Sequence, residues 1–142
     1  MDAAMHMNER NRWVDDASTA DERMFSTFTH LSLLAHLVLP YISILIPIIM
    51  WSMKKKESAY IADHGREAVN FQISLAIYSI LLPIIAIPIG LLLFVVGVAI
   101  TVPLAALFPY VLGLVGMIIA AVASNRGELY RYPMTIRFLT GR

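Results

Sequence analysis

The chain has 142 residues, of which 58% are hydrophobic and 15% charged, and its formal net charge is +1. Soluble domains carry charge on about a quarter of their residues, so this composition argues against a water-soluble protein. The sequence has no cysteine, which excludes disulfides, thiol catalysis and cysteine-ligated metals. The length suits a single domain.

Two long runs contain no Asp, Glu, Lys or Arg, namely residues 24–53 and residues 69–123. A helix that crosses a bilayer needs about 20 apolar residues. The first run therefore predicts one span, and the second predicts two spans with a turn near residues 97–103. We expect an all-α integral membrane helical bundle with three transmembrane helices, near residues 28–51, 67–97 and 103–123.

Two features of these runs leave alternatives. Residues 84–102 could form a shallow or re-entrant segment instead of the end of a span. Pro40 and Pro47 lie inside the first predicted span, where we expect them to kink the helix without ending it.

The charges outside the runs predict an orientation. Residues 1–27 hold six acids and three arginines, residues 54–67 hold four basic residues against three acids, and residues 124–142 hold four arginines against one acid. Loops rich in Lys and Arg stay cytoplasmic. We therefore expect a multi-pass protein of the cell (inner or plasma) membrane, with the C-terminus cytoplasmic and the N-terminus outside. The acidic start does not resemble a cleavable signal peptide, so the first span would direct insertion.

The segments that flank the first span differ in character. Residues 1–20 are polar and lack a periodic apolar face, which is typical of a mobile tail. Thr19 or Ser18 could cap a helix that follows this tail, and Ser58 is a suitable N-cap for a helix beginning at Ala59. On the second helix one face is polar, which predicts an amphipathic cytoplasmic approach helix; its residues are Asp63, Arg66, Glu67 and Asn70.

Uncharged polar residues repeat at helical spacing inside the predicted spans. They are His36 and Ser43 on the first span, Ser74 and Tyr78 on the second, and Tyr110 on the third. Polar groups in lipid need partners, so we expect these stripes to face each other. A structural, hydrogen-bonded role is favoured, and a proton or solute pathway through His36 is the alternative.

Small residues repeat every four positions in the third predicted span: Gly116, Ala120 and Ser124. This pattern lets two membrane helices approach closely. We favour packing within one chain over self-association to a homo-oligomer.

Residues able to perform catalysis are few and scattered. His64 with Glu67 has too few ligands to predict a metal site, and the sequence contains no nucleophile triad or phosphate-binding glycine loop. We therefore expect no enzyme activity, no cofactor and no metal. The C-terminal region, 124–142, interleaves arginines with aromatic residues, which favours an interfacial tail on an anionic leaflet over nucleic-acid binding.

Several short runs resemble one known family. They are residues 56–58, 61–64, 67–72, 125–128 and 130–133, with residues 29–32 fitting the family's start. The chain resembles a group of small prokaryotic membrane proteins of unknown function, similar to the twenty-kilodalton subunit of the chloroplast inner-envelope protein translocon. That chloroplast relative has four spans, which makes four the alternative to three here. The signature residues are His64, Glu67, Asn70, Phe71, Gln72, Gly127, Tyr132 and Pro133.

The resemblance implies a role beside a protein-conducting assembly, by analogy with the translocon. We expect a non-enzymatic structural or accessory component of a membrane assembly, whose partners are the lipid bilayer and a second copy or another membrane protein. The alternative is a small oligomeric pore or transporter for ions or small solutes. Since residues 63–72 and 126–133 are expected on the same side, we also predict that these two segments dock.

Overall fold

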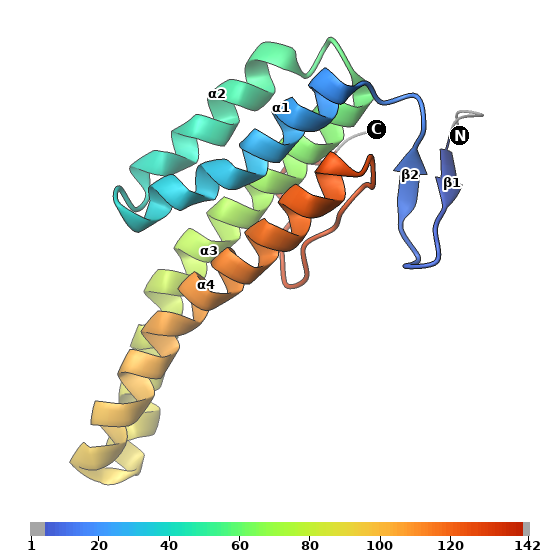
Figure 1. The fold of residues 1–142 in the computed structure, drawn as a ribbon. Helices are drawn as coiled ribbons and strands as arrows, with labels where there is room; N and C mark the ends of the chain where they lie inside the picture. The colour runs from blue at the N-terminus through green and yellow to red at the C-terminus, as the bar shows by residue number, and fades with distance from the viewer. Residues whose placement is uncertain (1–4, 141–142) are drawn as a thin grey trace.

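The structure, a computed structural model, describes residues 5–140. The chain is mostly helical, with one small two-stranded sheet and two long apolar helices (Figure 1). The elements are β1 Met5–Met7, β2 Trp13–Asp15, α1 Ala20–Leu31, the 3-10 helices η1 Ser32–Leu37 and η2 Ile42–Ile44, α2 Leu45–Lys54, α3 Ala59–Leu92 and α4 Phe94–Asn125. Residues 126–140, which we call the C-terminal segment, follow α4.

The first apolar run forms a helical hairpin, with α1 and α2 side by side (Figure 1). Thr19 caps α1 in a capping box with Glu22, as its sequence position allowed. The chain reverses over residues 38–41, where Pro40 lacks a backbone N–H and Tyr41 adopts a φ of +68°. The prediction of one helix over residues 28–51 is therefore wrong, because both features interrupt helical hydrogen bonding.

The second apolar run forms the long hairpin of α3 and α4. Ser58 caps α3, its side chain accepting a hydrogen bond from the N–H of Ile61, so the predicted start at Ala59 is confirmed. The turn lies at Leu93 and Phe94, with a φ of +65° at Phe94. The turn predicted near residues 97–103 is wrong, because α4 continues through Pro103 and Pro109.

The N-terminal region forms an antiparallel hairpin of β1 and β2 where an irregular tail was expected. β2 is fixed to the C-terminal segment, since Asp15 N–H donates to the Gly127 carbonyl (2.9 Å) and Leu129 N–H donates to the Trp13 carbonyl (2.7 Å). Residues 1–4 of the predicted tail, and residues 141–142 of the predicted C-terminal tail, lie outside the described residues.

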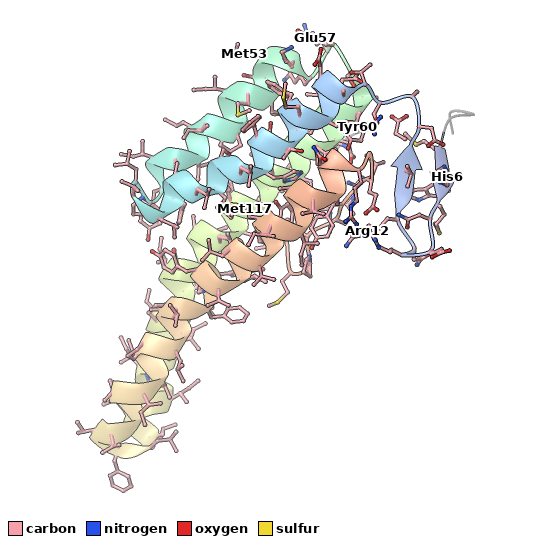
Figure 2. The ribbon with its side chains drawn as sticks, viewed as in Figure 1. His6, Arg12, Met53, Glu57, Tyr60 and Met117 are labelled. Atoms are coloured by element: carbon pink, nitrogen blue, oxygen red, sulfur yellow. The ribbon has the colours of Figure 1, made fainter. Side chains whose placement is uncertain are left out.

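The two ends of the molecule differ in chemistry. β1, β2, the start of α3 and the end of α4 lie at one end, where oxygen and nitrogen atoms gather around Arg12, Glu57 and Tyr60 (Figure 2). We call this the polar end. The opposite end is the α3–α4 turn, where Leu92, Phe94 and Val95 are each at least 80% exposed.

The other segments cover only part of the α3–α4 hairpin (Figure 1). The tip of the α1–α2 hairpin reaches Ser79, whose hydroxyl lies 3.4 Å from that of Tyr41. The C-terminal segment descends to the same level, where the Tyr78 hydroxyl donates to the Met134 carbonyl (2.6 Å). Beyond this level α3 and α4 continue as an uncovered apolar hairpin.

This arrangement bears on the number of spans. α1 begins and α2 ends at the polar end, so the first apolar run returns to where it started (Figure 1). Two helices, α3 and α4, are long and apolar enough to cross a membrane. Three crossings with the N-terminus opposite to the C-terminus are not confirmed.

Candidate functional site

The polar face of α3 holds the C-terminal segment by its backbone. The Asn70 side chain pairs with Leu139 through two hydrogen bonds, donating to its carbonyl and accepting from its N–H, each 2.8 Å long. Ser74 Oγ accepts from Ile136 N–H (2.8 Å). These bonds use backbone atoms, so the segment is fixed in an extended path whatever its side chains are.

Glu67 is the buried acid of this interface, 4% exposed. Its Oε1 accepts from the Tyr132 N–H at 2.8 Å and from the Arg137 guanidinium at 3.2 Å. A buried carboxylate requires such partners. The predicted docking of residues 63–72 on the segment after α4 is therefore confirmed, with Glu67 as the group that binds Tyr132.

Asp63 and two arginines form the outer edge of the interface. Asp63 accepts a bidentate pair of hydrogen bonds from Arg131 (2.6 and 2.7 Å) and a third from Arg66 (2.9 Å). Bidentate pairs between arginine and a carboxylate are among the stronger charge-assisted hydrogen bonds. The hydrogen bond to Asp63 raises the pKa of Arg131.

Phe71 and Tyr132 form the apolar centre of the same interface. Their rings stack 3.7 Å apart at an interplanar angle of 10°. Gly116 of α4 lies against this pair, and a Cβ at Gly116 would stand 2.9 Å from Phe71 and 3.1 Å from Tyr132. The close approach of α4 thus requires glycine at this position.

A chain of hydrogen bonds connects α1, α3 and the C-terminal segment behind the stack. Nδ1 of His30 lies 2.7 Å from the Tyr132 hydroxyl, and its Nε2 lies 2.9 Å from Nδ1 of His64. All three side chains are at most 2% exposed. Nε2 of His64 is buried and has no hydrogen-bond partner within residues 5–140.

The cluster of His30, His64 and Tyr132 is in an environment that disfavours charge. His64 precedes the charge-free part of α3, and burial, with the nearby charge of Arg131, lowers its pKa to about 3. Burial raises the pKa of Tyr132 well above its usual range. Both groups are therefore neutral near pH 7, because desolvation disfavours the charged form of each.

The remaining signature residues are structural. Gln72, 1% exposed, donates to Ser32 Oγ (3.3 Å) and so ties α3 to the α1–α2 hairpin. Gly127 has a φ of +77°, a conformation that favours glycine. Pro133 is exposed at the turn where the C-terminal segment reverses.

The predicted polar stripes meet only in part. His36 bonds to Ser43 (3.2 Å) and its ring lies 6.0 Å from that of Tyr110, so the stripes of the first and third predicted spans meet at this point. Ser74 and Tyr78 bind the C-terminal segment instead of Ser43. The prediction that they face the first span is wrong, because α3 directs them to the opposite partner.

The small-residue stripe of α4 packs inside the chain. Gly116, Ala120 and Ser124 are all buried, and the Ser124 carbonyl accepts a hydrogen bond from Tyr60. All three residues of the stripe therefore pack inside this chain.

Several residues of this site lie in or near the runs that carry the family resemblance but were not predicted as site residues, chiefly His30, Tyr60, Arg131 and Glu128. Glu128 is 4% exposed and accepts from Arg10 (3.1 Å) and Arg12 (2.9 Å), the latter marked in Figure 2. A signal existed for His30, since it is an uncharged polar residue in an apolar run, as His36 is. Its partners lie 34 and 102 residues away, a distance that no local pattern encodes.

The contacts of this site hold one part of the chain against another. Within residues 5–140 no three His, Cys, Asp or Glu side chains are grouped to hold a metal ion. The neutral His30–His64–Tyr132 chain and the bonded carboxylates instead fasten the C-terminal segment to α3. The molecule thus has a polar end held by side-chain hydrogen bonds and, joined to it, an apolar hairpin.

The model of the magnetosome magnetite crystal formation protein family, MamF/MmsF, matches residues 21–139. This chain belongs to the MamF/MmsF family. No curated protein and no solved structure matches it. The family is one of small prokaryotic membrane proteins, as the resemblance implied, and the comparison gives no support to a link with the chloroplast translocon.

In this MamF/MmsF protein the matched region begins in α1 and ends at Leu139, the residue that Asn70 holds. The matched region thus includes the α1–α2 hairpin, the long α3–α4 hairpin and nearly all of the C-terminal segment. Membership and the two long apolar helices together indicate a membrane protein.

Proposed function

We propose that this protein is a non-enzymatic membrane component accessory to magnetite crystal formation. The α3–α4 hairpin anchors it in the magnetosome membrane, and the polar end carries its recognition surface. The observation that carries this proposal is the division of one molecule into a charge-free hairpin and a hydrogen-bonded polar end.

The dimensions of the hairpin support an anchor. The charge-free part of α3, residues 69–92, has a length of about 36 Å at 1.5 Å per residue, against about 30 Å for the hydrocarbon core. The tip of the α1–α2 hairpin, at the level of Ser79, would then lie about 15 Å past Val69. In this arrangement α3 and α4 cross the bilayer and α1–α2 enters it and returns.

This arrangement places both chain ends on one side of the membrane. Ala20, Ser58 and Thr140 all belong to segments of the polar end (Figure 1). Because the chain has no cysteine, single cysteines at these positions can be labelled with a membrane-impermeant reagent. We expect all three to be labelled from the same side of sealed vesicles. Labelling of Ala20→Cys from the side opposite to Thr140→Cys would contradict the proposal.

The role in crystal formation is tested in cells that form magnetosomes. Replacement of the native gene by a variant that leaves the anchor intact but frees the end of the C-terminal segment, such as Asn70→Leu, should alter the size distribution of magnetite crystals in electron micrographs. Val111→Ile, which adds one methylene to an exposed position of α4, is the matched control and should leave crystals unchanged. Normal crystals in a strain lacking the protein would contradict an accessory role.

A small oligomeric pore is the second candidate function, and a cavity lined in part by polar side chains favours it. His36, Ser79 and Tyr110 line a cavity of about 20 Å³ between η1, α3 and α4, enough for about one water molecule. A pathway would need several copies to widen this space. Ion or solute flux into liposomes that is abolished by His36→Leu would support a pore, and absence of flux at any protein density would exclude it.

A further inference from the structure

Three arginines from two segments converge on one surface cavity of about 200 Å³. Arg66 comes from α3, whereas Arg131 and Arg137 come from the C-terminal segment, and Glu67, Leu139 and Thr140 complete the lining. The three arginine side chains are 25%, 48% and 45% exposed, respectively. They therefore line the cavity and remain accessible to a ligand.

The local charge balance favours an anion. Asp63 and Glu67 are the acids bonded to these arginines, so three positive charges face two negative charges. Each carboxylate already accepts hydrogen bonds from two partners. A guanidinium has five N–H donors, and the bonds to Asp63, Glu67 and the Tyr130 carbonyl use only some of the fifteen that the three arginines supply. The cavity thus offers surplus donors to a group with several acceptor oxygens.

The carboxylates also orient the arginines before any ligand binds. Arg131 is held in a bidentate pair by Asp63, and Arg137 is held by buried Glu67. Planar guanidinium groups held in this way suit a phosphate better than flexible ammonium groups do. A preorganised site loses less conformational entropy on binding.

The position of the cavity indicates which kind of phosphate-bearing ligand could reach it. Leu139 lines the cavity and is bonded to Asn70, the second residue of the charge-free part of α3. The C-terminal segment also exposes Met134, Ile136 and Phe138, at 58%, 40% and 52%. Arginines in the same short segment as exposed apolar side chains match the boundary between lipid headgroups and acyl chains.

We propose that Arg66, Arg131 and Arg137 form a binding site for the headgroup phosphate of an anionic phospholipid, whose acyl chains contact the exposed apolar residues of the C-terminal segment. The site would fix one lipid against the segment that α3 holds. It does not depend on the role in crystal formation.

The experiment measures lipid binding to the full-length protein, purified in detergent and freed of lipid, by native mass spectrometry. The probes are phosphatidylglycerol, phosphatidylcholine and inorganic phosphate. We expect phosphatidylglycerol to bind at one site, and Arg137→Gln to weaken it about tenfold, since one set of charge-assisted hydrogen bonds is lost. The matched control is Arg126→Gln, which removes the same charge from an exposed residue of the polar end outside this cavity and should leave the affinity unchanged.

Further variants and a competition experiment distinguish specific lipid binding from nonspecific attraction. Arg137→Lys keeps the charge but loses the planar fork, so its affinity should lie between those of the wild type and Arg137→Gln. If Arg137→Gln lowers the melting temperature, Arg66→Gln replaces it, because Arg66 is hydrogen-bonded to Asp63 on its own helix and not to the C-terminal segment. Equal weakening by Arg126→Gln would show nonspecific attraction and overturn the proposal. Displacement of phosphatidylglycerol by inorganic phosphate at equal concentration would overturn the lipid as the source, and binding of neither probe would overturn the site.

Discussion

Nε2 of His30 lies 2.9 Å from Nδ1 of His64, so imidazoles on α1 and α3 share one buried hydrogen bond. The other ring nitrogen of His30 meets Tyr132 at 2.7 Å. A hydroxyl donating to His30, whose Nε2–H then donates to His64, leaves both rings neutral and bonded. The pair therefore joins the α1–α2 hairpin to the long hairpin without a buried charge.

The first prediction is a loss of stability on mild acidification. The pKa of His64 is about 3 in the folded chain and about 6.5 in the unfolded chain. Between these values the unfolded state binds more protons, so stability falls as pH decreases below about 6.5. The groups that face His64 are the imidazole of His30, the phenol ring of Tyr60 and the charge of Arg131. The measurement is the midpoint of unfolding in mild detergent between about pH 7 and pH 5, a window above the ordinary carboxyl range.

The control for this titration is His64→Asn, whose side chain can bond to His30 but does not titrate. Its stability should depend less on pH than that of the wild type over the same window. Equal slopes for the two proteins would show that His64 does not carry the effect.

The second prediction concerns Gly116→Ala. The new Cβ would stand 2.9 Å from Phe71 and 3.1 Å from Tyr132, which are stacked and cannot both retreat. Overpacking of this kind costs about 1–3 kcal/mol. The melting temperature should fall, whereas Val111→Ile, which adds a methylene to an exposed position of the same helix, should leave it unchanged. Partial recovery in Gly116→Ala with Phe71→Leu would locate the strain in the stack.

Some of the features behind these predictions could be predicted from the sequence, and others could not. Ser58 and the phasing of Asp63, Glu67 and Asn70 predicted the start of α3 and its polar face, because capping and helical periodicity are local properties. The docking of the C-terminal segment followed from charge and topology. The exact partners did not, since Asn70 selects Leu139 by backbone geometry and not by side-chain type.

The α1–α2 hairpin could not be predicted from the sequence, for a physical reason. Hydropathy sums the transfer energies of residues and is the same for one straight helix as for two antiparallel halves. Reversal depends on the positive φ at Tyr41 and on contact of the tip with Ser79. Prolines such as Pro83 and Pro88, by contrast, remain inside α3, so proline alone does not mark the turn.

The third prediction concerns the attachment of the C-terminal segment. Asn70→Leu removes both hydrogen bonds to Leu139, which should free the end of the segment while the helices stay folded, because the segment can open locally. Trypsin should then cleave after Arg137 roughly tenfold faster, a change that corresponds to about 1.4 kcal/mol in the opening equilibrium. Ser52→Ala, at an exposed hydroxyl of α2, should not alter the cleavage rate. An unchanged rate in Asn70→Leu would show that other contacts hold the segment.

The fourth prediction tests the depth of the α1–α2 tip. Val38 is 79% exposed at the tip, and Met53 is 70% exposed near the polar end. The tip contacts Ser79, which lies about 15 Å past Val69 along α3. A nitroxide on Val38→Cys should therefore be deep in the bilayer. Power saturation with oxygen and a water-soluble nickel complex measures this depth.

Two reference positions decide the depth measurement. A label on Ile80→Cys, which is exposed on α3 just past Ser79, should report a depth similar to that at Val38, and a label on Met53→Cys should be shallow. If the first apolar run crossed the bilayer as one helix, the labels at Val38 and Met53 would still differ, but Lys54→Cys and Ala20→Cys would be reached by impermeant reagents from opposite sides. A hairpin requires a deep label at Val38 together with same-side access at its two ends. Only this combination is compatible with the reversal at Tyr41.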